Sequence, residues 1–453
     1  MTSTLFRTAS LFGVISLLSA CSMFGDDGDK KPRNKYDDEG RERISILTST
    51  QDLQADNAIA GIRVALPEPY RNGNWAQPGG NSSHSVQHLA LGGSLQKAWR
   101  TNIGKGNQSY ERIITGPVAA DGRVFAVDVR GYVTAVSLDS GRKLWTAEIR
   151  TGERSDVGFG GGVAYAGGAV YATSGYGVVV ALDAASGREL WRFKGSVPFR
   201  GAPTVTGGPA TPGGKVFAVT HDNMMMALDS QTGEQLWDQV GITESSGMLG
   251  AASPAFENGT VIMALSSGEL VAMRSENGRI LWQDSLTASR RLTPLATLAD
   301  IDASPVIDKN KAYALSHAGR MVAIDMRTGE RSWEADVAGV NTPWIAGNFG
   351  FLTTIDGQVI SVALGDGRVR WVTQLQRFLD QEKRRELVKW NGPVLAGDRL
   401  LVTSSHGYVL SVSPYSGKVI SGDKMAGGSS TPPIVVDGTL IVLTDNGDLV
   451  AYR

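Results

Sequence analysis

The sequence predicts an all-β protein, an eight-bladed β-propeller built from four-stranded blades. The main observation is a unit of roughly 46 residues that recurs from Gly116 to the last residue. Each unit holds two short strands, an Asp-x-x-(Ser/Thr)-Gly turn and a strand that carries Trp. Seven anchors stand 46, 46, 45, 51, 38 and 49 residues apart, at Trp145, Trp191, Trp237, Trp282, Trp333, Trp371 and Ile420. A period of this length with four strands per unit is typical of propellers.

The first unit shows how its strands are predicted. Apolar and small residues alternate along residues 117–119, 123–127, 132–138 and 143–149, from the inner to the outer strand. The turn before the outer strand offers Asp139 as a cap and Gly141 for a positive φ. We expect Trp145 and its equivalents to pack between blades, with the indole N–H bonded to a carbonyl.

The two ends of the repeat region predict how the ring closes. Residues 433–453 contain only three strands before the chain ends. The missing outer strand is found upstream, where the sequence KAWR at residues 97–100 repeats the pattern of KLWT at residues 143–146. A strand from the N-terminal side is therefore expected to complete the last blade, which leaves no long unpaired edge.

Length and charge limit the class of protein. The chain has 453 residues and a formal net charge of -1, with its basic residues scattered. A propeller of this size buries a large core and needs no disulfide or metal for stability. The charge distribution gives no nucleic-acid footprint, so no nucleic-acid partner is expected.

The N-terminus predicts export and lipidation. Arg7 precedes an apolar stretch at residues 11–18 that is too short to span a bilayer. The following Leu-Ser-Ala-Cys at residues 18–21 resembles a bacterial lipobox, and Cys21 is the only cysteine of the chain. We expect residues 1–20 to be a lipoprotein signal peptide and Cys21 to be the lipidation site, whose acyl chains anchor the protein.

Three further segments are expected after the cysteine. Residues 21–43 are charged and nearly free of apolar side chains, which predicts a flexible tether. Ser22 in place of an aspartate favours sorting to the outer membrane. Residues 44–94 are expected to form an extension lying on the propeller, with a short strand at residues 59–66 and a loop at residues 67–81. The propeller itself is expected at residues 95–453.

An insertion separates the sixth and seventh units at residues 375–389. Its apolar residues Leu375, Phe378, Leu379 and Leu387 stand among charged ones. This amphipathic pattern predicts one short helix, either a solvated insertion or a contact with a partner.

No set of residues with catalytic spacing is visible. The five histidines are scattered over different units, at His84, His88, His221, His317 and His406. His84 and His88 are four residues apart, but they lie in a Gly/Ser-rich segment where a helical metal pair is not expected. The sequence therefore predicts no catalytic residue, no metal site and no cofactor.

Units of the form G-x-V-x-A-L-D-x-x-T-G-x-x-L-W resemble two families of eight-bladed propellers. One is the quinoprotein alcohol dehydrogenases; the other is the BamB family of lipoproteins in the outer-membrane β-barrel assembly machine. The resemblance covers about residues 95–453. The chain is short for a quinoprotein dehydrogenase, and Cys21 alone cannot supply the adjacent cysteines that such enzymes often place over the quinone. The lipobox and tether also favour the BamB family.

The resemblance to the BamB family extends to two loops. LTPLATLADIDASPV, at residues 292–306, is similar to a loop with an acidic D-x-D, whose acids would be Asp300 and Asp302. ESSGMLGAASPA, at residues 244–255, is similar to the neighbouring loop. In the family, these loops contact a periplasmic POTRA domain of BamA, so the resemblance implies that partner. Asp302 could instead cap the turn that enters the next strand.

The second loop departs from the family pattern. Met248 and Leu249 fall near the apolar-and-Arg contact motif, but Leu249 or Gly250 stands where an arginine is expected. The contact is then either more apolar or displaced to Arg290 and Arg291.

The resemblance implies a non-enzymatic scaffold at the outer membrane, lipid-anchored and facing the periplasm. Its partners would be BamA, other lipoproteins of the assembly complex and unfolded outer-membrane proteins. Two alternatives remain open. One is a propeller like the quinone (PQQ)-dependent dehydrogenases, with a calcium-bound quinone on its axis and an Asp base. The other is a periplasmic propeller that binds a ligand or glycan.

Overall fold

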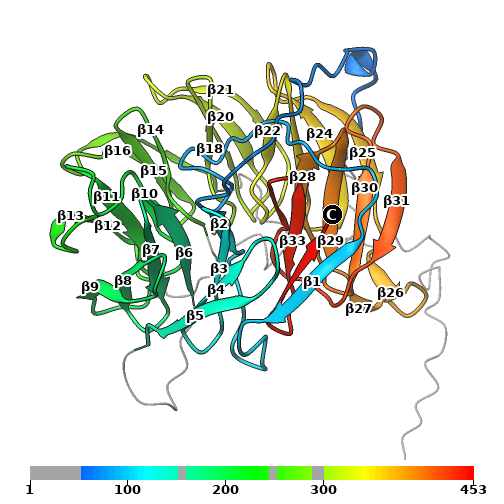
Figure 1. Ribbon diagram of the computed structural model, residues 1–453. Coiled ribbons are helices and arrows are strands. Elements are labelled where there is room, and N and C mark those ends of the chain that lie inside the picture. The colour runs from blue at the N-terminus through cyan, green and yellow to red at the C-terminus, as the bar shows by residue number, and fades with distance from the viewer. Residues whose placement is uncertain (1–52, 151–159, 244–251, 288–299) are drawn as a thin grey trace, which may run out of the picture. The chain divides into compact units, whose positions relative to one another are not determined.

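Eight four-stranded antiparallel sheets form a closed β-propeller (Figure 1), which confirms the predicted fold class. The computed structural model describes residues 53–150, 160–243, 252–287 and 300–453. Within these ranges, no helix has the length and apolar character needed to cross a membrane.

Blades 1 to 4 follow the chain, and each runs from its inner to its outer strand. Blade 1 comprises β2 (Val118–Ala120), β3 (Arg123–Val127), β4 (Tyr132–Ser137) and β5 (Lys143–Glu148), and blade 2 comprises β6 (Gly161–Ala166), β7 (Ala169–Ser174), β8 (Val178–Asp183) and β9 (Glu189–Lys194). Blade 3 comprises β10 (Thr204–Val205), β11 (Lys215–Val219), β12 (Met224–Asp229) and β13 (Gln235–Val240), and blade 4 comprises β14 (Ala255–Glu257), β15 (Thr260–Ala264), β16 (Glu269–Arg274) and β17 (Ile280–Ser285).

Blades 5 to 8 repeat the pattern, and blade 8 takes its outer strand from the N-terminal side. Blade 5 comprises β18 (Val306–Asp308), β19 (Lys311–Leu315), β20 (Met321–Asp325) and β21 (Arg331–Ala335), and blade 6 comprises β22 (Trp344–Ala346), β23 (Phe349–Thr353), β24 (Gln358–Ala363) and β25 (Val369–Gln374). Blade 7 comprises β28 (Trp390–Ala396), β29 (Arg399–Ser404), β30 (Tyr408–Val412) and β31 (Val419–Lys424), and blade 8 comprises β32 (Ile434–Val436), β33 (Thr439–Leu443), β34 (Asp448–Tyr452) and β1 (Lys97–Asn102).

The closing strand is the predicted one. β1 pairs antiparallel with β34, with Arg100 opposite Val450 and Asn102 opposite Asp448. Beyond the strands, the backbones of Gln96 and Arg453 exchange two hydrogen bonds of 2.8 and 2.9 Å. The first strand and the last strand of the propeller are therefore neighbours in one sheet.

Tryptophans dock seven of the eight blades onto the next, as predicted. The indole N–H of Trp191 donates to the carbonyl of Ser230, 3.0 Å away in blade 3. Its ring lies against Gly233 of the same turn, where an added Cβ would stand only 2.5 Å from the ring. Equivalent indole bonds run from Trp99, Trp145, Trp237, Trp282, Trp333 and Trp371 to the carbonyls of Leu138, Ala184, Ser275, Met326, Leu364 and Pro414.

One interface differs, and the structure explains why. Blade 7 carries Ile420 in place of Trp, and this side chain is 59% exposed. Its neighbour, blade 8, has no turn between the third and the outer strand, because these strands are the two ends of the propeller chain. The glycine turn and the tryptophan that packs on it are therefore absent together.

The extension makes one circuit of the axis. Residues 72–89, which we call the axial strap, bond to blades 8, 1, 2, 3, 4, 5, 6 and 7 in that order, and Figure 1 shows this part of the chain in blue on one side of the ring. Trp75 exchanges two backbone bonds of 2.7 Å with Ala119, and Leu89 donates to Leu395. The side chain of Gln77 replaces a backbone partner, because it bonds to both the N–H and the carbonyl of Val205.

Two predicted elements are wrong. Residues 59–66 do not form a strand, because the structure has a short 3-10 helix, η2 (Asn57–Ile59), followed by chain without regular secondary structure. The amphipathic insertion at residues 375–389 is a hairpin of β26 (Phe378–Asp380) and β27 (Arg385–Leu387) instead of a helix. So few apolar residues over so short a segment fit a short hairpin as well as a helical face.

Candidate functional site

The predicted site lies where the chain enters the inner strands of blades 4 and 5. We call the residues directly before an inner strand its lead-in segment. The backbone N–H of Ser253, before β14, donates to the hydroxyl of Ser304, before β18, at 2.9 Å. The N–H of Ser304 in turn donates to the hydroxyl of Thr342, before β22. These hydroxyls join the lead-in segments of three successive blades.

A buried ion pair lies beside this chain of hydroxyls. Arg200, in the lead-in segment of blade 3, donates to the carboxylate of Asp300 at 2.6 Å. The same guanidinium nitrogen stands 3.6 Å from an oxygen of Asp302. The side chains of Arg200 and Asp300 are each 1% exposed, and that of Asp302 is 9% exposed. One buried cation therefore faces two carboxylates.

This arrangement shifts the ionisation of Asp302. Burial and the charge of Asp300 raise the pKa of Asp302 to about 7, and the guanidinium of Arg200 opposes the shift. One oxygen of Asp302 and one nitrogen of Arg200 are buried without a hydrogen-bond partner. Nearby, the N–H of His317 donates to the carbonyl of Asp300, and burial lowers the pKa of the imidazole.

The predicted partner-binding residues divide into two groups. Asp300 and Asp302 are described, and both point into the molecule toward Arg200. The described residues give Asp302 no turn-capping hydrogen bond, and its role in partner binding stays a prediction. Met248, Leu249, Arg290 and Arg291 lie outside the described residues, as does Cys21.

Sequence reasoning missed Arg200. A signal for it was present, because Arg200 stands three residues before Pro203 and Asp302 stands three residues before Pro305. The two residues therefore occupy the same position of the repeat with opposite charge. Their pairing across blade 4 could not be read from a single unit.

A cavity of about 680 Å³ lies inside the ring of lead-in segments. Residues Trp75, Pro78 and Gly79 of the axial strap line one side of it. Its wall comes from the lead-in segments of blades 1, 4, 5, 6, 7 and 8, and includes Asp302. This volume lies within the range of small-molecule sites, about 300 to 1,000 Å³. We call it the axial cavity.

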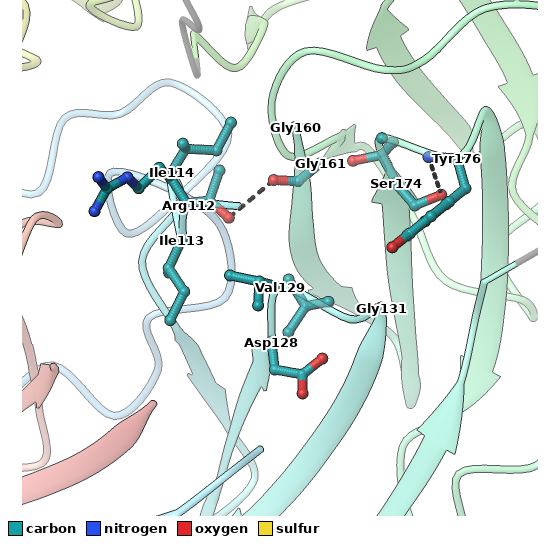
Figure 2. Close-up of a pocket in the computed structure, with 14 residues that line it drawn as sticks. Arg112, Ile113, Ile114, Asp128, Val129, Gly131, Gly160, Gly161, Ser174 and Tyr176 are labelled. Carbon is teal, nitrogen blue, oxygen red and sulfur yellow. Dashed lines mark hydrogen bonds between the residues drawn. The ribbon is translucent and has the colours of Figure 1, made fainter. Parts of the chain in front are cut away.

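A second, much smaller cavity of about 30 Å³ separates blades 1 and 2 (Figure 2). At its edge, the hydroxyl of Thr115 in blade 1 donates a hydrogen bond to the carbonyl of Gly161 in blade 2, at 3.0 Å. It has room for little more than water, so it is not a candidate ligand site.

The residues present do not fit the calcium-bound quinone of the dehydrogenase alternative. In the described ranges, no three His, Cys, Asp or Glu side chains gather in a way that could hold a metal ion. His84 and His88 do not share a site either, because their Nδ1 atoms bond to the carbonyls of Pro305 and Pro67. Of the two carboxylates that line the axial cavity, Asp302 faces Arg200 and Asp300, and Asp445 accepts hydrogen bonds from Asn107 and Ser430.

Fold and site together define an eight-bladed propeller whose blades are docked by tryptophan and whose lead-in segments carry a buried charge cluster. The family model described as Outer membrane protein assembly factor BamB matches residues 129–373, more than half of the chain, and the chain belongs to this family.

Relatives and solved structures agree with this assignment. The chain is 26% identical over 206 residues to BamB of Escherichia coli (strain K12), and 28% identical over 199 residues to BamB of Legionella pneumophila (strain Paris). These matches cover 45% and 44% of this chain, and it spans about half the length of each relative, 50% in both cases.

Solved structures show the same fold. The crystal structure of BamB from Moraxella catarrhalis has a TM-score of 0.66 at 18% identity, covering 80% of this chain and 100% of that one. Quinohemoprotein alcohol dehydrogenase from Comamonas testosteroni has a TM-score of 0.64 at 14% identity, covering 88% and 82%. At such identities the likeness concerns the fold alone, and the family assignment rests on the family model.

Proposed function

We propose that the chain is a non-enzymatic scaffold subunit of an outer-membrane protein assembly complex, and that it binds the POTRA domain of BamA. The observation that carries this proposal is the bond between Ser253 and Ser304, at 2.9 Å. It joins the described ends of the two segments that resemble the family's contact loops. The described ends of both segments are therefore neighbours on the propeller, and in this proposal one partner engages both segments.

The buried cluster fixes described residues next to one of these segments. Arg200 ties blade 3 to the chain that enters blade 5, so the segment ending at Asp300 is held at its base. Because binding costs less free energy when the contact surface is preorganised, a fixed base favours partner binding. In this proposal Asp300 and Asp302 position the surface, while Met248, Leu249, Arg290 and Arg291 provide the contacts.

The cellular setting of this function is also a proposal. Acyl chains on Cys21 would hold the protein at the outer membrane, and residues 21–43 would connect the anchor to the propeller in the periplasm. Other lipoproteins of the complex and unfolded β-barrel precursors would meet the propeller there. The relatives in Escherichia coli and Legionella pneumophila are outer membrane protein assembly factors, which supports this process.

Affinity capture of the full-length protein from its own membranes tests the proposal. Arg290→Glu/Arg291→Glu reverses two charges in the predicted contact, and Arg274→Glu is the matched control on an exposed strand end of blade 4. We expect BamA to be recovered with the native protein and the control, and to be lost with the double variant.

Two results would count against parts of the proposal. Recovery of BamA with all three forms would keep the partner and reject Arg290 and Arg291 as contacts. If no form recovers BamA while circular dichroism shows a folded β-protein, the scaffold function is wrong.

A further inference from the structure

We propose that the axial cavity binds a small polyhydroxylated anion, of the sugar-acid or sugar-phosphate class. The proposal is independent of partner binding, because it concerns the interior of the ring of lead-in segments. Three observations carry it: the charges at the cavity, the polar groups of its wall and its closed side.

Two cationic side chains at the cavity have no counter-charge within the described part of the chain. Arg112 and Lys389 both line it and are both exposed. Among the residues that the structure describes, neither forms an ion pair. Figure 2 shows the guanidinium of Arg112 extending away from the small cavity between blades 1 and 2. Arginine and lysine are the side chains that proteins use to bind carboxylates and phosphates.

The acidic residues of the cavity are already engaged. Asp302 faces Arg200, as described above. Asp445 accepts hydrogen bonds from the side-chain amide of Asn107 at 2.9 Å, and from the N–H and hydroxyl of Ser430 at 2.9 and 3.1 Å. Arg112 and Lys389 are therefore the charged groups of the cavity that remain to bind a ligand. Because both are cations, the ligand that complements them is an anion.

The wall offers hydrogen-bonding groups suited to hydroxyls. Ser253, Ser304, Thr342, Asn391, Ser405 and Ser430 all line the cavity. The Ser253 hydroxyl is buried and has no hydrogen-bond partner among the described residues. Buried polar atoms in folded proteins are nearly always paired, so this hydroxyl indicates a missing donor or acceptor. A ligand rich in hydroxyl groups can provide it.

The axial strap gives the cavity a closed side. Trp75, which is 3% exposed and stacked on Trp344, contributes to this side together with Pro78 and Gly79. A volume of about 680 Å³ with one closed side suits a compact molecule such as a monosaccharide derivative.

Isothermal titration calorimetry on the full-length protein tests the inference with four probes. Glucuronate and glucose 6-phosphate are the complete probes, because they carry both sugar hydroxyls and a negative charge. Glucose carries only the hydroxyls, and inorganic phosphate carries only the charge, so each of these represents one half of a complete probe. We expect one of the two complete probes to bind with a Kd on the order of 0.1 mM, and both halves to bind at least about tenfold more weakly.

Paired variants separate the site from the fold. Arg112→Ala/Lys389→Ala should weaken the complete probe about tenfold or more, since charge-assisted hydrogen bonds are lost. Arg274→Ala, which removes an exposed arginine that does not line the cavity, should leave the affinity unchanged. Both variants should melt at the temperature of the native protein, because the replaced side chains are exposed.

Three results would overturn the inference. The first is the absence of binding heat and of thermal stabilisation with every probe at 10-fold the expected Kd, about 1 mM. The second is equal affinity of the double variant and the native protein. The third is that phosphate or glucose alone binds as tightly as the complete probe. BamA recovery plays no part in this test, so either proposal can fail without the other.

Discussion

The guanidinium of Arg200 and the carboxylate of Asp300 are one hundred positions apart in the chain and 2.6 Å apart in the structure. The bond passes across blade 4, from the lead-in segment of blade 3 to that of blade 5. Both side chains are 1% exposed, so the pair is not weakened by solvent as a surface ion pair would be. Loss of one partner would leave an unneutralised charge inside the protein.

Arg200→Met should therefore destabilise the propeller strongly. Removing one partner of a buried ion pair costs about 3 to 5 kcal/mol, because the remaining charge stays buried. Urea unfolding followed by fluorescence measures the change, with Arg274→Met as an exposed control. Adding Asp300→Asn and Asp302→Asn to Arg200→Met should restore most of the stability. A loss below about 1 kcal/mol for Arg200→Met would show that the pair does not hold the blades together.

The pH dependence of stability should report on Asp302. Its pKa is raised from 3.8 to about 7 in the folded protein, chiefly by burial and then by the charge of Asp300, against the effect of Arg200. The folded state therefore keeps a proton that the unfolded state releases near pH 4. The contribution of Asp302 to stability is greatest below pH 4, and it falls as the pH rises to about 7.

Asp302→Asn should remove this contribution to the pH dependence. We expect the variant to match the native protein near pH 4, and to exceed it at pH 8 by about 1 kcal/mol or more. Denaturant unfolding at the two pH values provides the measurement, with the exposed Asp336→Asn as control. Equal pH profiles for Asp302→Asn and the native protein would contradict the shifted pKa.

Two glycines of blade 4 separate the effect of docking from that of the backbone. Gly278 and Gly259 have φ values of +71° and +80°, so alanine is strained at both. A Cβ on Gly259 meets nothing within 4 Å, whereas a Cβ on Gly278 would lie 2.7 Å from the ring of Trp237. Gly259→Ala should cost about 1 kcal/mol, and Gly278→Ala about 1 to 3 kcal/mol more. Thermal unfolding of the two variants measures the difference. Equal melting temperatures would mean that the ring of Trp237 moves aside for the added methyl group at no cost in stability.

The axial strap should stabilise blade 3 through one side chain. Gln77 bonds to the N–H and carbonyl of Val205, at 3.1 and 2.6 Å, in an inner strand of only two residues. Gln77→Met would leave both backbone groups unpaired, at a cost of about 1 to 3 kcal/mol. Hydrogen exchange should show faster exchange of the Val205 amide, while the exposed Gln231→Met leaves it unchanged. Unchanged exchange in Gln77→Met would assign the stability of this strand to its neighbours.

Most of the fold could be predicted because each blade repeats the same local chemistry. The Asp-x-x-(Ser/Thr)-Gly turn predicts where the outer strand begins, and Trp marks the surface that meets the next blade. The repeat also predicted β1 as the closing strand, since KAWR follows the pattern of the other outer strands. The exposed Ile420 obeys the same rule, because the turn it would dock on does not exist.

What the sequence did not predict depends on contacts that no single unit contains. The axial strap has no repeat, and its path is set by bonds to eight different blades. The insertion at residues 375–389 is too short for its period to distinguish a hairpin from a helix. The buried charge cluster was not predicted: Asp300 and Asp302 carried a recognisable motif, whereas Arg200 acquires these partners through the closure of the ring.

The pairing of β1 with β34 has a consequence for the synthesis of the protein. A ribosome makes β1 before any blade and β34 after all the other strands of the propeller, so blade 8 cannot be completed until every other blade has been synthesised. A chain cut short near its end would leave β1 without its partner strand and expose an unpaired sheet edge. Completion of the ring thus distinguishes molecules that contain β34 from those that lack it, and a protease that attacks open sheet edges would remove only the latter.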